Sequence, residues 1–296
     1  KDIYEACVAH GTAFVLPCLI TSPLENILKG IAAVKEFQEK HPEAGVIGMH
    51  LEGPFLNVKK RGAHLEKYVR IPTDDELESI CKAGEGVIKI MTIAPENFTE
   101  AQIKRLHSAG FTLSVGHTNA TYEEAQWAFS QGIQLVTHLY NAMSGLQHRQ
   151  PGVVGAALAN TQVYAPIILD GHHCHYGAAK VAYQAKKDKL FLISDALFLG
   201  KQTTHFQWQE FDATLQNGTY INSEGNLAGA AVSLADTIRN AVNEVEIPLE
   251  EAIEMATQRP AKAIGLENHI GNIRIGKPAV FTKFDDALQT FEVLKY

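Results

Sequence analysis

The sequence lacks the features that would place it in a membrane or on a nucleic acid. No apolar run approaches the roughly 20 residues that a membrane-spanning helix requires, and no segment has the composition of a secretory signal peptide. Basic residues are not in excess, because 26 Lys and Arg stand against 33 Asp and Glu and leave a net charge of −7. Nucleic-acid binding calls for a basic face. We therefore expect neither a membrane nor a nucleic acid as a partner.

Cysteine is also scarce, and its spacing is irregular. The four cysteines, Cys7, Cys18, Cys81 and Cys174, show neither the pairs of a zinc finger nor a disulfide framework. Free thiols in a reducing cytoplasm are the expected state. Histidine, in contrast, is frequent at 13 residues, and several histidines cluster.

Apolar runs typical of strands alternate with amphipathic helices along most of the chain. The runs lie near residues 15, 48, 90, 113, 135, 167 and 192, and each connection can hold a helix, which predicts a parallel sheet. The length of 296 residues and the 46% hydrophobic content suit a (β/α) barrel with a small appendage. Seven strands are one short of a closed (β/α)8 TIM-type barrel, and the chain opens on a helix. We expect such a barrel with its first strand absent from this chain; a doubly wound open sheet is the alternative.

Two segments interrupt this alternation. Residues 202–227 alternate apolar and polar side chains around Asn217-Gly218, which predicts a β-hairpin insertion. Residues 271–296 are strand-like and predict the C-terminal part of a small β subdomain, a remnant of a β-sandwich, so that residues 1–270 form the barrel domain. Because a lone hairpin is only marginally stable, we expect this tail to pair with a segment that precedes Lys1.

Four polar residues follow predicted strands, namely Glu52, His117, His138 and Asp195. The carboxyl ends of parallel strands meet at one edge of an α/β fold, where sites are built. One Glu and two His form a ligand set for a catalytic zinc or iron that leaves a position open for water. The ion would lower the pKa of that water, and Asp195 could shuttle its proton to the leaving group. Each residue alone has an ordinary structural interpretation; the four together indicate a metal centre.

Five motifs carry a family resemblance. They are His50-Leu51-Glu52-Gly53-Pro54, Val115-Gly116-His117-Thr118-Asn119-Ala120, Thr137-His138-Leu139-Tyr140-Asn141-Ala142-Met143, Asp170-Gly171-His172-His173 and Ser194-Asp195-Ala196. In this order, from about Ala6 to Pro278, the chain resembles the N-acetylglucosamine-6-phosphate deacetylases of the amidohydrolase superfamily. The resemblance implies a (β/α)8 barrel with a small β-sandwich. It also implies cleavage of the acetamide to glucosamine 6-phosphate and acetate.

The resemblance assigns roles to individual residues. Glu52, His117 and His138 are implied as ligands of one or two zinc or iron ions per subunit, and Asp195 as the catalytic carboxylate. The implied contacts to the amino-sugar phosphate are Ala63, His64, Asn141, Ala142, Arg149, His173, Leu227, Ala228 and Gly229. The bidentate guanidinium group of arginine suits a phosphate dianion. Arg149 is similar to a family residue that one subunit of a homodimer contributes to the site of the other. His64 is expected to stabilise the tetrahedral intermediate together with the ion.

The sequence departs from the family pattern at its start. Family members begin with sandwich strands and a first barrel strand that carries His-x-His or a substituted pair, and neither is present here. A barrel without that strand would expose unpaired edges, so we expect the chain to be part of a longer protein. The number of metal ions stays open, as does the activity of this chain by itself.

Two other functions and one other site are weighed against this interpretation. The same residues could deacetylate N-acetylgalactosamine 6-phosphate, because the two sugars differ at one hydroxyl. A non-catalytic sugar-phosphate-binding relative is less favoured, because a pure binder has no need of Asp195. The run His172-His173-Cys174-His175 could form a separate metal site, but alternate residues in a strand-end loop diverge.

Overall fold

The computed structural model describes residues 1–201 and 203–296, and the chain divides into two compact units. Unit 1 comprises Lys1 and Phe14–Val163, and unit 2 comprises Asp2–Ala13 and Tyr164–Tyr296. The predicted domain boundary near residue 270 stays a prediction. Within the described part of the chain, no helix combines the length and the apolar character of a membrane span.

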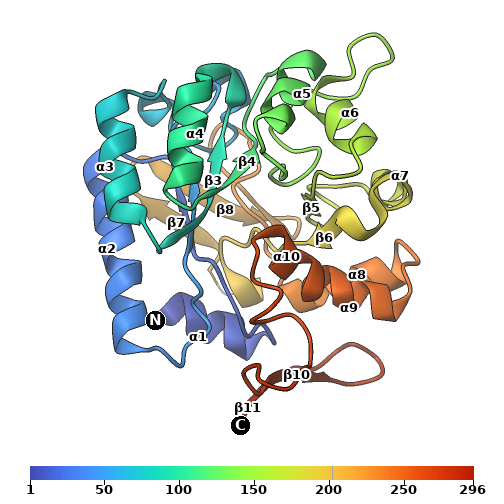
Figure 1. Cartoon of the computed structure of the whole chain (residues 1–296). Helices are drawn as coiled ribbons and strands as arrows, with labels where there is room; N and C mark the ends of the chain where they lie inside the picture. Colours follow the sequence, from blue (N-terminus) through green and yellow to red (C-terminus); the bar gives the residue numbers. More distant parts are fainter. Residues whose placement is uncertain (202) are drawn as a thin grey trace. The chain divides into compact units, whose positions relative to one another are not determined.

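Unit 1 is built on a parallel sheet of four strands in the order β1-β2-β3-β4. The strands are β1 (Cys18–Ile20), β2 (Met49–Glu52), β3 (Ile88–Ile93) and β4 (Thr112–Val115). The helices are α2 (Leu24–Lys40), α3 (Asp74–Gly84), α4 (Glu100–Ser108), α5 (Tyr122–Ser130) and α6 (Gly152–Ala159). Helices α2, α3 and α4 lie side by side along the sheet in Figure 1. The predicted alternation of strand and helix is confirmed for this part of the chain.

Local sequence signals explain where these helices begin and what they bury. Thr99 and Thr121 begin α4 and α5 with capping boxes, in which each threonine hydroxyl accepts the backbone N–H three residues on. The side chains that face the sheet recur at helical spacing and are fully buried, namely Ile27, Ile31, Leu77, Ile80, Ile103 and Leu106. The helices are thus fixed by caps at one end and by an apolar stripe along their length.

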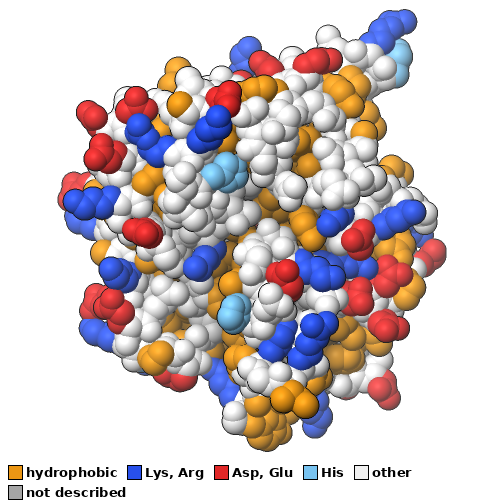
Figure 2. All heavy atoms as spheres, in the orientation of Figure 1, with side chains coloured by type: hydrophobic (Ala, Val, Ile, Leu, Met, Phe, Trp, Pro, Cys, Tyr) orange, Lys and Arg blue, Asp and Glu red, His pale blue; other side chains and the backbone are white. Residues whose placement is uncertain are grey.

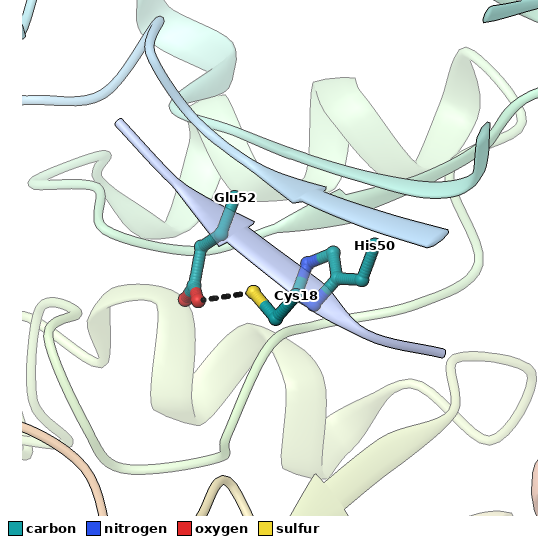
Figure 3. A group of neighbouring side chains, drawn as sticks. All are labelled: Cys18, His50 and Glu52. Carbon is teal, nitrogen blue, oxygen red and sulfur yellow. Dashed lines mark hydrogen bonds between the residues drawn. The ribbon is translucent and has the colours of Figure 1, made fainter. Parts of the chain in front are cut away.

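The pairing of β1 with β2 sets the orientation of several polar side chains. Cys18 is the register partner of His50, and Ile20 is the partner of Glu52. Because side chains alternate between the faces of a strand, His50 and Glu52 share one face, and Leu51 between them is completely buried on the other. Figure 3 shows Cys18, His50 and Glu52 gathered on that face.

The strand predicted over Ile133–Thr137 is reduced to an isolated bridge between Val115 and Val136. The backbone still runs parallel to β4, since the Thr137 N–H donates to the Val115 carbonyl at 2.9 Å. The extended run ends at His138, whose φ of 29° lies in the left-handed region. This turn leaves too few consecutive bonds for a full strand.

Unit 2 contains a parallel strand pair, an antiparallel sheet and a C-terminal hairpin. Its strands are β5 (Ala165–Ile167), β6 (Leu190–Leu192), β7 (His205–Trp208), β8 (Phe211–Gln216), β9 (Thr219–Ile221), β10 (Val280–Phe284) and β11 (Phe291–Lys295). Its helices are α1 (Asp2–Ala9), α7 (Tyr176–Lys186), α8 (Leu234–Asn243), α9 (Leu249–Ala256) and α10 (Gln258–Ala263). Strands β5 and β6 pair in parallel, with Ala165 opposite Leu190.

The predicted hairpin insertion is a sheet of three strands, β7-β8-β9. The turn at Asn217-Gly218 is present, with φ values of 51° and 91°, as the type I′ preference of this pair requires. A second turn at Gln209, with φ of 55°, adds the extra strand. Glutamine carries no turn signal, which is why the sequence pattern missed it. Gln202, the first residue of the predicted insertion, lies outside the described residues.

The C-terminal strands β10 and β11 form an antiparallel hairpin that packs with α1. The Lys295 ammonium donates to the Tyr4 hydroxyl at 2.6 Å, and the Thr282 hydroxyl donates to the Gly11 carbonyl at 3.0 Å. Hydrophobic side chains gather over this hairpin in Figure 2, whereas acidic and basic side chains intermix over the rest of the face drawn. The first and last segments of the chain therefore belong to one unit.

Removal of the α5 cap should measurably weaken the fold. Replacing Thr121 with alanine deprives the Glu124 N–H of its acceptor and should lower the free energy of unfolding by about 1 kcal/mol. Thr121→Ser keeps the hydroxyl and serves as the matched control. Urea unfolding followed by circular dichroism measures both variants; equal midpoints for the two would contradict the role of the cap.

Candidate metal centre

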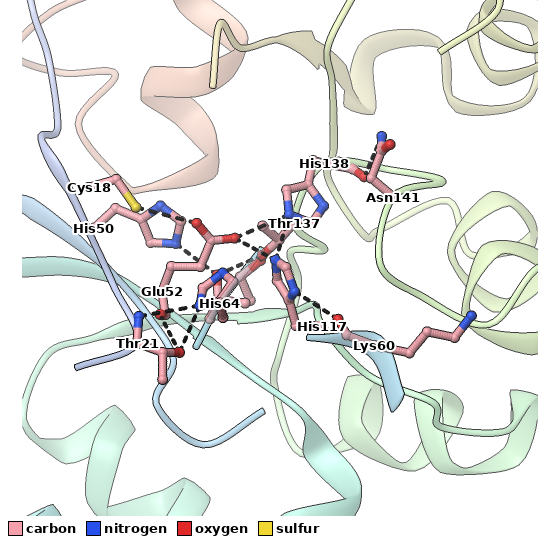
Figure 4. Close-up of polar contacts among 12 residues, drawn as sticks. Cys18, Thr21, His50, Glu52, Lys60, His64, His117, Thr137, His138 and Asn141 are labelled. Atoms are coloured by element: carbon pink, nitrogen blue, oxygen red, sulfur yellow. Dashed lines mark hydrogen bonds and ion pairs between the residues drawn. The ribbon is translucent and has the colours of Figure 1, made fainter. Parts of the chain in front are cut away.

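The structure brings Glu52, His117 and His138 together at the end of the unit 1 sheet. Glu52 Oε1 lies 3.0 Å from His117 Nε2 and 3.1 Å from His138 Nε2, and the two nitrogens are 3.0 Å apart. Each of the three residues is only 5% exposed, and Figure 4 shows their polar ends turned toward one another. Ligands of a tetrahedral zinc ion, at bond lengths of about 2.0–2.1 Å, lie roughly 3.3 Å apart. This triangle of donor atoms therefore fits a divalent cation after a small expansion.

The loop after β2 prepares His117 as a ligand. This loop contains the 3₁₀ turns η1 (Val58–Lys60) and η2 (Glu66–Tyr68). His117 Nδ1 donates to the Lys60 carbonyl at 2.9 Å. Because this contact keeps a proton on Nδ1, Nε2 is the ring nitrogen left to face a cation in the triangle, as in metal-bound histidines with an outer hydrogen bond.

Unusual backbone conformations at His117 and His138 orient both side chains toward Glu52. His117 has φ of 48° and His138 has φ of 29°, in the left-handed region that residues other than glycine seldom adopt. The preceding residue, Gly116, allows the neighbouring segment to approach β4 closely. A Cβ atom added there would lie 2.6 Å from Thr137 Cβ. Strain of this kind persists where the surroundings enforce it, and it clusters at functional sites.

The electrostatics of the triangle favour an ionised Glu52. Burial acts to raise the pKa of its carboxyl group, but the hydrogen bonds and charges of His117 and His138 outweigh burial and hold the pKa well below its ordinary value. Glu52 is therefore a carboxylate near neutral pH. An anionic oxygen between two imidazole nitrogens is the donor set of a catalytic zinc or iron site.

His64 packs against this triangle as a neutral ring. Its ring centroid lies 4.4 Å from that of His117, and its Nδ1 accepts the Thr21 N–H at 3.3 Å. Burial, assisted by the charge of His117, lowers the pKa of His64 to about 3. A neutral ring with an accepting Nδ1 carries its proton on Nε2, so His64 can donate a hydrogen bond from that atom.

A chain of buried hydroxyls lies beneath the ligands, and sequence reasoning did not identify it. His50 Nε2 lies 2.7 Å from Thr92 Oγ1, which in turn lies 2.7 Å from Thr137 Oγ1. Ser114 Oγ completes the chain at 2.6 Å from the Thr137 hydroxyl. Polar residues within otherwise apolar strands were the available signal, because a buried hydroxyl needs a partner.

Glu96 joins the loops that follow three strands, and it was also missed. One carboxylate oxygen accepts hydrogen bonds from Asn57 Nδ2 at 2.9 Å and from the Asn119 N–H at 2.8 Å. The other accepts the Thr118 hydroxyl at 2.5 Å. These loops follow β2 and β4, the strands that supply Glu52 and His117, and Glu96 itself follows β3. The contact thus fixes the strand-end loops around the ligands.

Other predicted residues of unit 1 lie near the ligands, with one exception. Asn141 donates its backbone N–H to the His138 carbonyl at 2.9 Å, and the Ala142 carbonyl accepts the Thr118 N–H at 3.1 Å. Ala63 directly precedes His64. Arg149 lies apart, in the exposed loop of residues 146–150 before α6, and the described residues show no hydrogen bond from it to the three ligands.

In unit 2 the structure brings Asp195 together with the predicted backbone-contact segment. Asp195 follows β6 with φ of 47°, the same conformation as His117. Its carbonyl accepts the Ala230 N–H at 2.8 Å. A Cβ atom added at Gly229 would lie 3.0 Å from Leu197 Cβ. Leu227, Ala228 and Gly229 therefore lead directly into the backbone that holds Asp195.

The histidine run after β5 has separate structural partners. The Asp170 carboxylate accepts a hydrogen bond from Nδ1 of the His173 ring at 2.7 Å. Burial acts to raise the pKa of Asp170, but this hydrogen bond and the charge of His173 lower it. His175 instead caps α7 by accepting the Gly177 N–H at 3.0 Å. His173 and His175 thus contact different partners, as expected if the side chains of alternate residues in a strand-end loop diverge.

Comparison with known proteins identifies the family. Residues 2–295 match the amidohydrolase family. The chain belongs to this family. The N-acetylglucosamine-6-phosphate deacetylase of Haemophilus influenzae is 37% identical over 284 residues, which are 95% of this chain and 74% of that protein. The N-acetylgalactosamine-6-phosphate deacetylase of Shewanella sp. is 39% identical over 278 residues, 93% of this chain and 70% of that protein.

A solved structure extends the similarity to the fold. The crystal structure of N-acetylglucosamine-6-phosphate deacetylase from Pasteurella multocida matches with a TM-score of 0.93 and 36% identity, over 98% of this chain and 76% of that one. The predicted fold class, a (β/α)8 TIM-type barrel of the amidohydrolase family, is confirmed by this match. The family resemblance stated from the motifs is confirmed as well.

Loss of one triangle ligand should abolish tight metal binding. His117→Ala removes Nε2 from the donor set and should weaken zinc binding roughly 100-fold or more. Titration calorimetry on the metal-free protein measures the affinity. His41→Ala, which changes a partly exposed histidine at the end of α2, should bind zinc as the unaltered protein does. Equal affinities for the two variants would show that the triangle does not hold the metal.

Proposed function

We propose that the chain hydrolyses the acetamide of N-acetylglucosamine 6-phosphate to glucosamine 6-phosphate and acetate. The observation that carries this proposal is the buried triangle of Glu52, His117 and His138 in a member of the amidohydrolase family. The protein of Haemophilus influenzae, which carries this activity in its name, is 37% identical to the chain over 284 residues.

Glu52, His117 and His138 are the residues that would hold the metal. Two imidazoles and one carboxylate suit zinc or ferrous iron better than magnesium, which prefers oxygen ligands and water. When bound, such a cation acts as a Lewis acid and makes water a nucleophile near neutral pH. The ionised Glu52 offers such a cation a negatively charged ligand.

His64 and Asp195 are proposed to supply the remaining steps. The proton on His64 Nε2 is available to the acetyl oxygen, which becomes negative when the carbonyl carbon becomes tetrahedral. Asp195 takes a proton from the attacking water and returns it to the amide nitrogen. The C–N bond then breaks, so that the carbon retains the new oxygen as acetate and the nitrogen leaves as the amine.

The remaining predicted residues are proposed to bind the sugar phosphate. Asn141 and the Ala142 backbone lie beside His138 in the same turn, where they can contact the sugar. Arg149, on an exposed loop, suits a role at the phosphate in the partner subunit of a homodimer. Further proposed contacts are Ala63, His173, Leu227, Ala228 and Gly229.

The state of the cysteines bears on the cellular compartment in which the protein works. The four cysteines, all within the described residues, are thiols and not disulfides, which is the normal state in a reducing environment. We therefore infer a cytoplasmic enzyme.

The galactosamine epimer is the second candidate substrate. The relative from Shewanella sp., named for N-acetylgalactosamine-6-phosphate deacetylation, is 39% identical, and the relative from Haemophilus influenzae, named for the gluco substrate, is 37% identical. One hydroxyl separates the two sugars, and a site that hydrogen-bonds a hydroxyl can discriminate strongly against its misplacement.

Acetate release from both sugars tests the proposal. With the zinc-loaded protein, kcat/KM for N-acetylglucosamine 6-phosphate should exceed that for the galacto epimer at least about tenfold, a difference of about 1.4 kcal/mol. The opposite order would establish the second candidate. Binding of either sugar without acetate release would instead support a non-catalytic relative and overturn both enzymatic proposals.

Substitution of the proposed proton shuttle gives a separate test. Asp195→Asn preserves size and should reduce kcat about 10²- to 10⁴-fold, because the amide cannot accept the proton. Zinc affinity should stay near that of the unaltered protein, since the three metal ligands are retained. Asp188→Asn, at an exposed position, is the matched control. Unchanged turnover in Asp195→Asn with zinc retained would rule out the shuttle.

A further inference from the structure

Glu96 lies just beyond β3 and contacts two loops that both hold His117. It follows Pro95 in the 3₁₀ turn η3 (Pro95–Asn97) and is partly buried. None of the five sequence motifs that point to the metal centre includes it. Its carboxylate nevertheless accepts hydrogen bonds from the loop after β2 and from the loop after β4, and both contacts lead to the same histidine.

The first connection runs through the backbone that follows His117. Thr118 is completely buried, and its hydroxyl donates to Glu96 Oε2 at 2.5 Å while it accepts the Ala120 N–H at 3.0 Å. The Asn119 N–H donates to Glu96 Oε1 at 2.8 Å, so that one carboxylate binds both residues after the ligand. Because His117 has φ of 48°, a conformation that its surroundings must enforce, this contact helps to hold the turn that orients its ring.

The second connection runs through the loop after β2 to the His117 side chain. Asn57 Nδ2 donates to Glu96 Oε1 at 2.9 Å, and Asn57 Oδ1 accepts the Lys59 N–H at 3.0 Å and so caps η1. The Lys60 carbonyl in that turn accepts a hydrogen bond from His117 Nδ1 at 2.9 Å. Glu96 therefore also supports the contact at Nδ1, which leaves Nε2 to face a cation.

The loop after β4 also reaches the second histidine ligand. The Thr118 N–H donates to the Ala142 carbonyl at 3.1 Å, and the Asn141 N–H donates to the His138 carbonyl at 2.9 Å. Thr118 therefore joins the turn after His138 to the carboxylate of Glu96. A displacement of Thr118 would act on the backbone of both histidine ligands.

We propose that Glu96 is a positioning residue for the metal centre, which acts on both histidine ligands through the two loops that it joins. It does not touch the cation; it sets how the two Nε2 atoms meet around one. Substitution of residues that support metal ligands changes metal affinity about 10- to 100-fold, and the lower value is expected here because Glu96 acts through the backbone. This inference rests on the metal centre of the proposed function and deepens it by assigning a residue that tunes its affinity.

Glu96→Gln distinguishes positioning from a merely structural role. The amide still accepts hydrogen bonds at one oxygen, but its NH2 group cannot accept the Thr118 hydroxyl, whose proton is then buried without an acceptor. Zinc affinity, measured by competition with a chromophoric chelator, should fall roughly tenfold, and the visible spectrum of the cobalt(II)-loaded protein should change. Glu100→Gln, at an exposed position of α4, is the matched control and should equal the unaltered protein in both measurements.

Two substitutions at Thr118 test the same contact without altering Glu96. Thr118→Val removes the hydroxyl and should weaken zinc binding about as much as Glu96→Gln does, whereas Thr118→Ser keeps the hydroxyl and should retain the affinity. When Glu96→Gln and Thr118→Val are combined, the loss should be smaller than the product of the two separate fold-changes, because both substitutions remove one contact.

The outcomes separate this inference from the proposed function. Unchanged zinc affinity in Glu96→Gln, with only the free energy of unfolding of the metal-free protein lowered, would show a merely structural role and overturn the inference. If Glu96→Gln does not fold, equal zinc affinities of Thr118→Val and Thr118→Ser would overturn it instead. Acetate release by the zinc-loaded, unaltered protein is measured in parallel. Its absence would refute the deacetylase, whereas the zinc affinities would still decide the role of Glu96.

Discussion

The need to compensate the buried charge of Glu52 governs the organisation of unit 1. A carboxylate that is only 5% exposed is costly unless cations or hydrogen-bond donors surround it. Here the Nε2 atoms of His117 and His138 contact one oxygen and the Cys18 thiol contacts the other. The left-handed turns at both histidines are understandable as the conformations that direct these donors toward the charge. A divalent cation would compensate the same charge more completely, which is why the arrangement favours metal binding.

The supporting contacts keep these donors in place. The Lys60 carbonyl accepts a hydrogen bond from Nδ1 of His117, the ring nitrogen remote from Glu52, and so fixes the orientation of the ring. Glu96 holds the backbone just beyond His117 through the Thr118 hydroxyl and the Asn119 N–H. These groups come from loops after different strands, so a ligand cannot shift without disturbing several hydrogen bonds. Rigid support of this kind gives a binding site its geometric precision.

The sequence predicted those features that local patterns or parallel topology determine. The alternation of apolar runs with amphipathic segments was sufficient for the strands and helices of unit 1, and strand-end positions sufficed to group Glu52, His117 and His138. Features that depend on register were missed. The pairing of Cys18 with His50 arises from the register of β1 against β2, and no local pattern encodes which residues of two separate strands become partners. The turn at Gln209 has no sequence signal for the same reason: its left-handed conformation is imposed by the pairing of β7 with β8.

Different hydrogen bonds set the two chemical requirements of the proposed reaction. Metal affinity depends on the Glu52 triangle and its supports in unit 1, whereas the position of Asp195 depends on backbone bonds within unit 2. There the Ala230 N–H donates to the Asp195 carbonyl, and the Ala230 carbonyl accepts the Leu197 N–H at 3.0 Å. A substitution at Gly229, whose φ of 108° suits glycine alone, would therefore disturb proton transfer without removing a metal ligand. A variant that binds metal normally can for this reason be catalytically inert, and metal content alone is no measure of an intact active site.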